Sequence, residues 1–94
     1  MDTPAVIRRA NLRVTGRVQG VFFRDSLRSR AAAEGVAGWA RNCSDGSVEV
    51  VLEGEPEAVA TVEAFVRAGP RGARVNEVEA TDEEPTGLTR FEIR

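Results

Sequence analysis

Histidine, lysine and tyrosine are absent from this 94-residue sequence, and cysteine occurs once. Without histidine there is no Ser–His or Cys–His nucleophile pair and no imidazole for a metal site. Without lysine there is no Walker-type phosphate loop and no Schiff base. Any chemistry must therefore come from arginine, carboxylates, hydroxyls, amides, Cys43 or the main chain.

Two further absences concern the setting of the protein. The single cysteine, Cys43, cannot form an internal disulfide, which is typical of a reducing compartment. No apolar run is long enough to cross a bilayer, and residues 1–4 lack the basic and apolar segments of a secretory signal. We expect a cytoplasmic monomer with one domain, residues 1–94, and no membrane partner.

Charge is distributed unevenly along the chain. Residues 1–30 carry seven arginines and two acids, whereas residues 31–94 carry six arginines and thirteen acids. The overall net charge of −2 argues against general nucleic-acid binding. The basic first third predicts a local positive field around residues 16–24, which suits a small anion.

Apolar periodicity predicts an α+β fold. Strands are expected at 6–15, 36–41, 48–53 and 74–81, with a short C-terminal strand at 91–93. Helices are expected at 25–34 and from the segment 54–57 to the glycines at 69–72, with an acidic turn at 82–87. This order predicts a ferredoxin-like βαββαβ sandwich, a mostly antiparallel sheet with two helices on one face.

The stretch from Gly16 to Arg24 is the first candidate site. A glycine-bearing loop between a strand and a helix N-terminus exposes main-chain N–H groups that favour an anion. A cation at Arg24 gains nothing from the helix dipole, so it makes better sense beside a bound phosphoryl group. The alternative is a plain connecting loop with a solvated arginine.

Asn42 is the second candidate, at the end of the second predicted strand. Its amide could hold a water for in-line attack if the first loop and the end of the strand antiparallel to it lie close together. The alternative is an asparagine that begins a turn by bonding its own main chain.

Other reactive-looking residues give weaker signals. A cysteine phosphatase needs an arginine six positions after its cysteine, and Glu49 occupies that position after Cys43. We expect Trp39 to pack at the core or its rim, and we expect the acids at 82–84 to form a solvated turn without metal spacing.

A site with an anion cradle, an arginine and an amide has no evident acid, base or nucleophile. It cannot protonate a poor leaving group. It could still hydrolyse a carboxyl–phosphate anhydride, because a carboxylate departs unaided and the protein need supply only positioning and electrostatics.

These residues resemble the acylphosphatase family. The loop Gly16 to Arg24 is similar to the family's signature, and a second family pattern is matched at Gly38-Trp39, Asn42, Asp45-Gly46 and Val48-Glu49. Gly69-Pro70 and the ending Phe91 to Arg94 also resemble the family, so the resemblance covers nearly the whole chain.

The resemblance implies hydrolysis of acyl phosphates to a carboxylate and inorganic phosphate, without metal or cofactor. It implies that Arg24 and Asn42 form the catalytic pair, with Asn42 orienting the attacking water. The implied phosphate-binding residues are Gln19, Gly20, Val21, Phe22, Phe23 and Arg24. Asp25 departs from relatives, in which bulkier residues are common there, and an acid could weaken phosphate binding.

Two other functions fit the same fold. One is a non-catalytic module that binds phosphate or a phosphorylated metabolite. The other is an RNA-recognition module, which stacks bases on aromatic side chains of its first and third strands. Residues 12–14 and 48–52 contain no aromatic residue, which argues against RNA binding.

Overall fold

The computed structural model describes residues 6–94, and the expectation for residues 1–4 lies outside them. No helix in this part of the chain is long and apolar enough to cross a membrane. The strands are β1 (Arg8–Arg17), β2 (Ala37–Asn42), β3 (Val48–Gly54), β4 (Arg74–Glu83) and β5 (Phe91–Ile93). The helices are α1 (Phe23–Glu34) and α2 (Pro56–Ala68).

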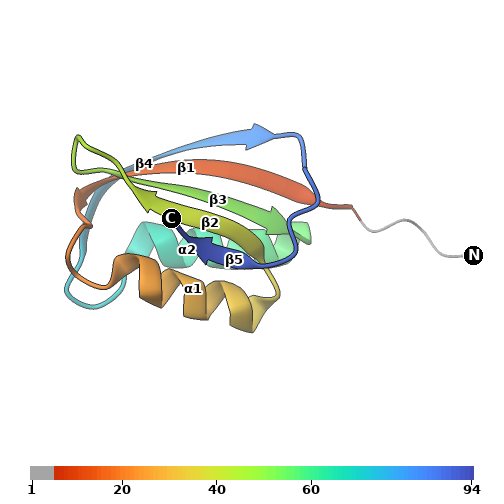
Figure 1. Ribbon diagram of the computed structural model, residues 1–94, viewed down its shortest axis with the longest axis horizontal. Coiled ribbons are helices and arrows are strands. Elements are labelled where there is room, and N and C mark those ends of the chain that lie inside the picture. Colours follow the sequence, from red (N-terminus) through yellow and green to blue (C-terminus); the bar gives the residue numbers. More distant parts are fainter. Residues whose placement is uncertain (1–5) are drawn as a thin grey trace, which may run out of the picture.

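The five strands form one sheet in the order β4-β1-β3-β2-β5. All neighbouring pairs are antiparallel except β2 and β5, which are parallel. Both helices cover the same face of the sheet (Figure 1). The predicted ferredoxin-like α+β fold, with its short C-terminal strand, is therefore confirmed.

The core lies between the sheet and the helices, as the apolar pattern predicts. Phe23, Leu27 and Ala31 form the buried stripe of α1, and alternate residues of β1 and β3 face them. Gly35 ends α1 in the left-handed conformation with φ of 69°, and its N–H reaches the last-turn carbonyls. This confirms the predicted glycine at the helix C-terminus.

Several predicted boundaries are wrong. β1 continues through Gly16 to Arg17 because a bulge after Thr15 keeps the strand paired with β4. A Cβ atom at Gly16 would lie 2.1 Å from the carbonyl oxygen of Arg74, so only glycine fits this bulge. α1 begins two residues earlier than expected, at Phe23, and β2 ends one residue later, at Asn42.

The expected acidic turn is also partly wrong. Asp82 and Glu83 belong to β4, where they pair with Arg8 and Arg9 of the neighbouring strand β1. Cross-strand charge pairing therefore extends the strand beyond its apolar part.

The predicted positive field is likewise reduced by pairing. Arg8, Arg9 and Arg13 all contact acidic side chains from the later part of the chain. Charge summed along the sequence overstated the field because these arginines and acids meet on the folded sheet.

On the face of the sheet away from the helices, Glu53 is buried at 3% exposure. One of its carboxylate oxygens accepts N–H groups from Thr86, Gly87 and Leu88 at 3.1, 2.6 and 3.1 Å, and the other accepts from Arg9 Nη1 at 3.1 Å. Burial alone raises the pKa of Glu53, but these donors outweigh it and hold the pKa below its ordinary value. The carboxylate fixes the segment that leads into β5.

Candidate active site

The loop after β1 is anchored at both ends by buried side chains. Val18 is 1% exposed and Phe23 is 2% exposed. Between them the main chain has positive φ at Gly20 (71°) and Phe22 (57°). Phe22 is the only non-glycine residue with positive φ within residues 6–94, and a bulky side chain there costs about 1–2 kcal/mol. The loop is therefore held in a conformation that the isolated chain would rarely adopt.

The main-chain N–H groups of residues 19–25 have no hydrogen-bond acceptor within residues 6–94. None of them donates in the hydrogen bonds of the described residues, and the first such donor in α1 is Ser26, which reaches Phe22 O at 3.0 Å. The positive end of the α1 dipole lies at the same place. The loop and helix start therefore offer several free donors to an anion.

Arg24 is the second residue of α1 and is half-buried. Its Nη1 donates to the main-chain oxygen of Arg94 at 2.9 Å, which joins α1 to the residue after β5. Arg24 takes part in none of the ion pairs with acidic side chains found within residues 6–94. Its charge is thus left without an acidic side chain as partner within the described residues, although the helix dipole disfavours a cation there.

Asn42 is the exposed last residue of β2. Its side chain makes no hydrogen bond within the described part of the chain. The turn that follows is organised instead by Asp45, whose Oδ1 accepts from the N–H and the hydroxyl of Ser47 at 3.0 and 2.6 Å. These bonds, the Ser47 hydroxyl first, lower the pKa of Asp45 to about 2. The turn-forming role considered for Asn42 belongs to Asp45.

Gln19 joins the loop to this turn. Its Nε2 donates to the carbonyl oxygens of Cys43 and Ser47, both at 2.8 Å. One side chain thereby spans the two carbonyls that flank the turn.

The predicted direction of β2 relative to β1 was wrong. The two strands are parallel to each other, because each is antiparallel to β3 between them. Their C-terminal ends, and hence the loop and Asn42, lie at the same end of the sheet.

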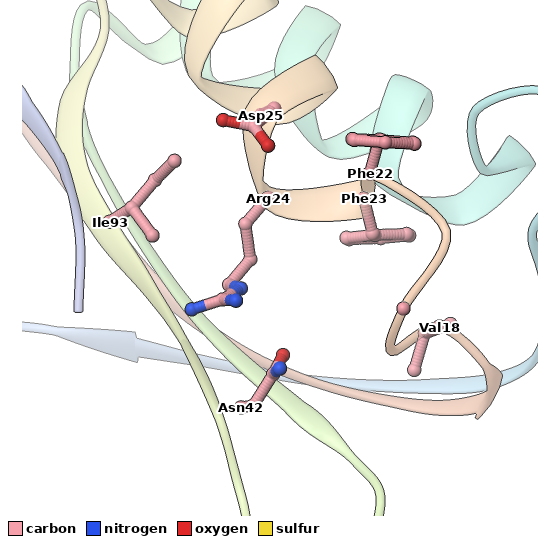
Figure 2. Close-up of a pocket in the computed structure, with 8 residues that line it drawn as sticks. Val18, Phe22, Phe23, Arg24, Asp25, Asn42 and Ile93 are labelled. Carbon is pink, nitrogen blue, oxygen red and sulfur yellow. The ribbon is translucent and has the colours of Figure 1, made fainter.

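One pocket gathers most of the predicted site residues (Figure 2). Its lining comprises Val18, Gly20, Phe22, Phe23, Arg24, Asp25, Asn42 and Ile93. Gln19 and Val21 were predicted to bind phosphate but do not line it. Figure 2 shows the Arg24 side chain extending from α1 toward Asn42, with Ile93 on one side and Phe23 on the other.

Sequence reasoning missed Ile93, because nothing in its local pattern indicates that a three-residue strand pairs in parallel with β2 beside the pocket. Asp25 was identified as a departure, but only the structure places it in the lining. Cys43 and Trp39 lie outside the lining. Trp39 is partly exposed, with the Arg94 guanidinium 4.7 Å from its ring centre. Within residues 6–94 no group of three or more acidic, cysteine or histidine side chains could hold a metal ion.

The fold and the site define a small ferredoxin-like α+β domain whose pocket combines a strand-to-helix loop, an arginine and an amide. The family model of acylphosphatases matches residues 10–93. The chain belongs to the acylphosphatase family, and the resemblance drawn from its motifs is confirmed.

Individual relatives agree with this assignment. The chain is 48% identical to an acylphosphatase of Rubrobacter xylanophilus over all of this chain and 86% of the relative. It is 51% identical to an acylphosphatase of Thermococcus kodakarensis over 90% of this chain and 93% of the relative. Among solved structures it is similar to an acylphosphatase from Coxiella burnetii, with a TM-score of 0.89 and 33% identity over 94% and 93% of the two chains.

Proposed function

We propose that the chain, acting as a single domain over residues 1–94, hydrolyses acyl phosphates to a carboxylate and inorganic phosphate. Family membership supports the reaction class. The observation that carries the mechanism is a set of free donors at one pocket. It comprises the main-chain N–H groups of residues 19–25, of which Gly20 and residues 22–25 line the pocket, and the Arg24 guanidinium, which pairs with no acidic side chain within residues 6–94. Those donors suit a phosphoryl group.

In this mechanism the phosphoryl oxygens accept N–H groups from residues 19–23 and from the Arg24 guanidinium. The contact with Arg94 fixes the side chain of Arg24 but occupies only one of its five donors, so the remaining donors can bind the ligand. The anion also removes the cost of placing a cation at the start of α1.

Asn42 positions the attacking water. Its side chain makes no bond within the described protein, so both its carbonyl oxygen and its amide group are available to a water molecule in the pocket. A new bond forms between the water oxygen and phosphorus while the bond from phosphorus to the acyl oxygen breaks. The electron pair leaves on the carboxylate, and a phosphoryl oxygen takes the water proton, giving RCOO⁻ and H₂PO₄⁻.

No general base is needed in this scheme, because the proton acceptor is the substrate's own phosphoryl group. No general acid is needed either, because the carboxylate is a good leaving group. Catalysis rests on positioning and on donors aimed at the reacting phosphoryl group. We further propose that the protein acts as a monomer without a metal ion, and that it acts in the cytoplasm, because its one cysteine is free.

Hydrolysis of benzoyl phosphate, measured with excess chelator, tests the reaction. The expected result is turnover that survives the chelator and is lost in Arg24→Ala, together with affinity for inorganic phosphate. Arg71→Ala is the matched control, since Arg71 is an exposed arginine outside the pocket. Turnover retained by Arg24→Ala contradicts the proposed site.

Asn42→Ala separates binding from chemistry. We expect turnover to fall by about two or more orders of magnitude, as loss of an oriented catalytic group often does, while phosphate still binds. Asn76→Ala, on the exposed strand β4, is the control. Phosphate binding without any turnover of the unmodified protein would instead favour the non-catalytic phosphate-binding module.

A further inference from the structure

Asp25 is the one acidic side chain in the lining of the pocket, and the proposed mechanism does not use it. It is the third residue of α1, directly after Arg24. Its only bonded partner among the described side chains is Arg28, at 3.2 Å, and both side chains are more than half exposed, at 57% and 53%. Such a pair is well solvated, so it neutralises the carboxylate only in part.

In-line displacement fixes the side on which the acyl group leaves. The attacking water and the leaving oxygen must lie on opposite sides of phosphorus. With the water at Asn42, the acyl group points away from Asn42. Figure 2 shows Asn42 and Asp25 at opposite ends of the pocket, with the side chain of Arg24 between them. The acyl group therefore leaves toward the start of α1, where Asp25 lies.

The side chains that line the pocket on this side are apolar except for Asp25. Phe22 is 79% exposed, and Ile93 contributes from β5. Arg24, the one cation in the lining of this pocket, is engaged with the phosphoryl group and with Arg94 in the proposed mechanism. A negatively charged acyl group would thus lie near the Asp25 carboxylate, and the lining would offer it no free cationic side chain.

We propose that Asp25 determines the substrate class of this site: acyl phosphates with a neutral or cationic acyl group are preferred over those with an anionic one. The inference rests on the proposed function. Two like charges separated by several ångströms in this exposed setting predict a discrimination of about three- to ten-fold at low ionic strength. Because the site is open to solvent, salt at about 1 M should remove most of it.

The test compares kcat/KM for benzoyl phosphate, 4-carboxybenzoyl phosphate and 4-trimethylammoniobenzoyl phosphate. These probes share one rigid ring and differ in the charge at its far end. Each substrate is compared between Asp25→Asn and the unmodified protein, so that differences in intrinsic reactivity cancel. Circular dichroism establishes that every variant is folded at the assay temperature, because Asp25 also favours the helix N-terminus.

Asp25→Asn is expected to raise the relative kcat/KM for the carboxy substrate about three- to ten-fold and to lower it for the cationic one, relative to benzoyl phosphate. Arg28→Gln removes the ion-pair partner of Asp25. It should therefore lower the relative kcat/KM for the carboxy substrate and raise it for the cationic one. Glu34→Gln removes a negative charge at the other end of α1 and should leave the ratios unchanged.

If Asp25→Asn changed kcat/KM equally for all three substrates, the proposed role of Asp25 would be overturned, while the proposed function would stay intact. A shift of the same size in Glu34→Gln would also overturn it, because the effect would then reflect net charge. Absence of turnover of all three substrates by the unmodified protein would contradict the proposed function, and the specificity would fail with it.

Discussion

Glu53 allows the sharpest prediction about stability. Its carboxylate, and not a helix or a paired strand, accepts the main-chain N–H groups of the segment before β5. The side chain is almost fully buried and accepts three main-chain N–H groups and one guanidinium donor. A hydrogen bond to a charged group contributes about 1.5–3 kcal/mol, and breaking a buried ion pair costs about 3–5 kcal/mol. We expect Glu53→Ala to lose about 3–5 kcal/mol of unfolding free energy.

Glu53→Gln should lose about 2–3 kcal/mol, because the amide keeps one acceptor for the N–H groups but presents a second donor to Arg9. Urea unfolding measures both losses, and hydrogen exchange of Thr86, Gly87 and Leu88 reports the local opening. Glu84→Gln, at an exposed acid of the same segment, is the control. A loss below about 1 kcal/mol in Glu53→Ala would refute the argument.

The pH dependence of the same variant gives a second check. Folding lowers the pKa of Glu53 below its ordinary value of 4.5. The contribution of the Glu53 carboxylate to the free energy of unfolding is therefore complete above pH 4.5, and it is lost as the pH falls through the pKa that Glu53 has in the folded protein. The stability difference between the unmodified protein and Glu53→Gln should therefore be constant above about pH 5 and should shrink in stronger acid. A difference that does not change down to about pH 2 would contradict a charged acceptor.

Three further predictions concern other parts of the fold. Gly38→Ala would place Cβ 1.8 Å from the carbonyl oxygen of Val51, so it should cost more than about 4 kcal/mol in urea unfolding. Gly54→Ala meets only ordinary contacts, the nearest at 3.6 Å, and should stay within about 1 kcal/mol; similar losses in the two variants would be the contrary result. Gln19→Leu removes two bonds between the loop and the turn and should lower kcat for benzoyl phosphate in a folded protein; unchanged kcat would show that the tie is dispensable. The Asp45 carboxyl should titrate near pH 2 by NMR and move upward in Ser47→Ala, whereas titration near 4 in the unmodified protein would contradict the Ser47 bonds.

Most of the fold could be predicted from local pattern. The alternation of Ala10, Leu12 and Val14 and the four-residue spacing of Phe23, Leu27 and Ala31 each require one buried face, and the structure buries both. Strand ends were predicted less well. The extension of β4 to Glu83 depends on arginines of β1 some 74 residues away along the chain, which local pattern does not reveal.

Part of the pocket lining was predictable, because the residue type itself carries the signal. A glycine-bearing loop followed by a cation at a helix start is unusual enough to indicate an anion, and Arg24 does line the pocket. Ile93 and the contact from Arg24 to Arg94 could not be predicted in the same way. Both depend on the parallel pairing of β5 with β2, which is set by tertiary packing.

Arg24 and Asn42 are brought together by two long-range ties. Gln19 holds the loop against the β2–β3 turn, and Arg24 holds the start of α1 against the residue after β5. Each tie uses a main-chain oxygen as its acceptor, so the positions are fixed without an acidic side chain paired with Arg24. An acidic side chain paired with Arg24 would compete with the phosphoryl group of the proposed substrate for the same guanidinium donors. The geometry thus combines a positioned arginine with guanidinium donors that remain available to the proposed substrate.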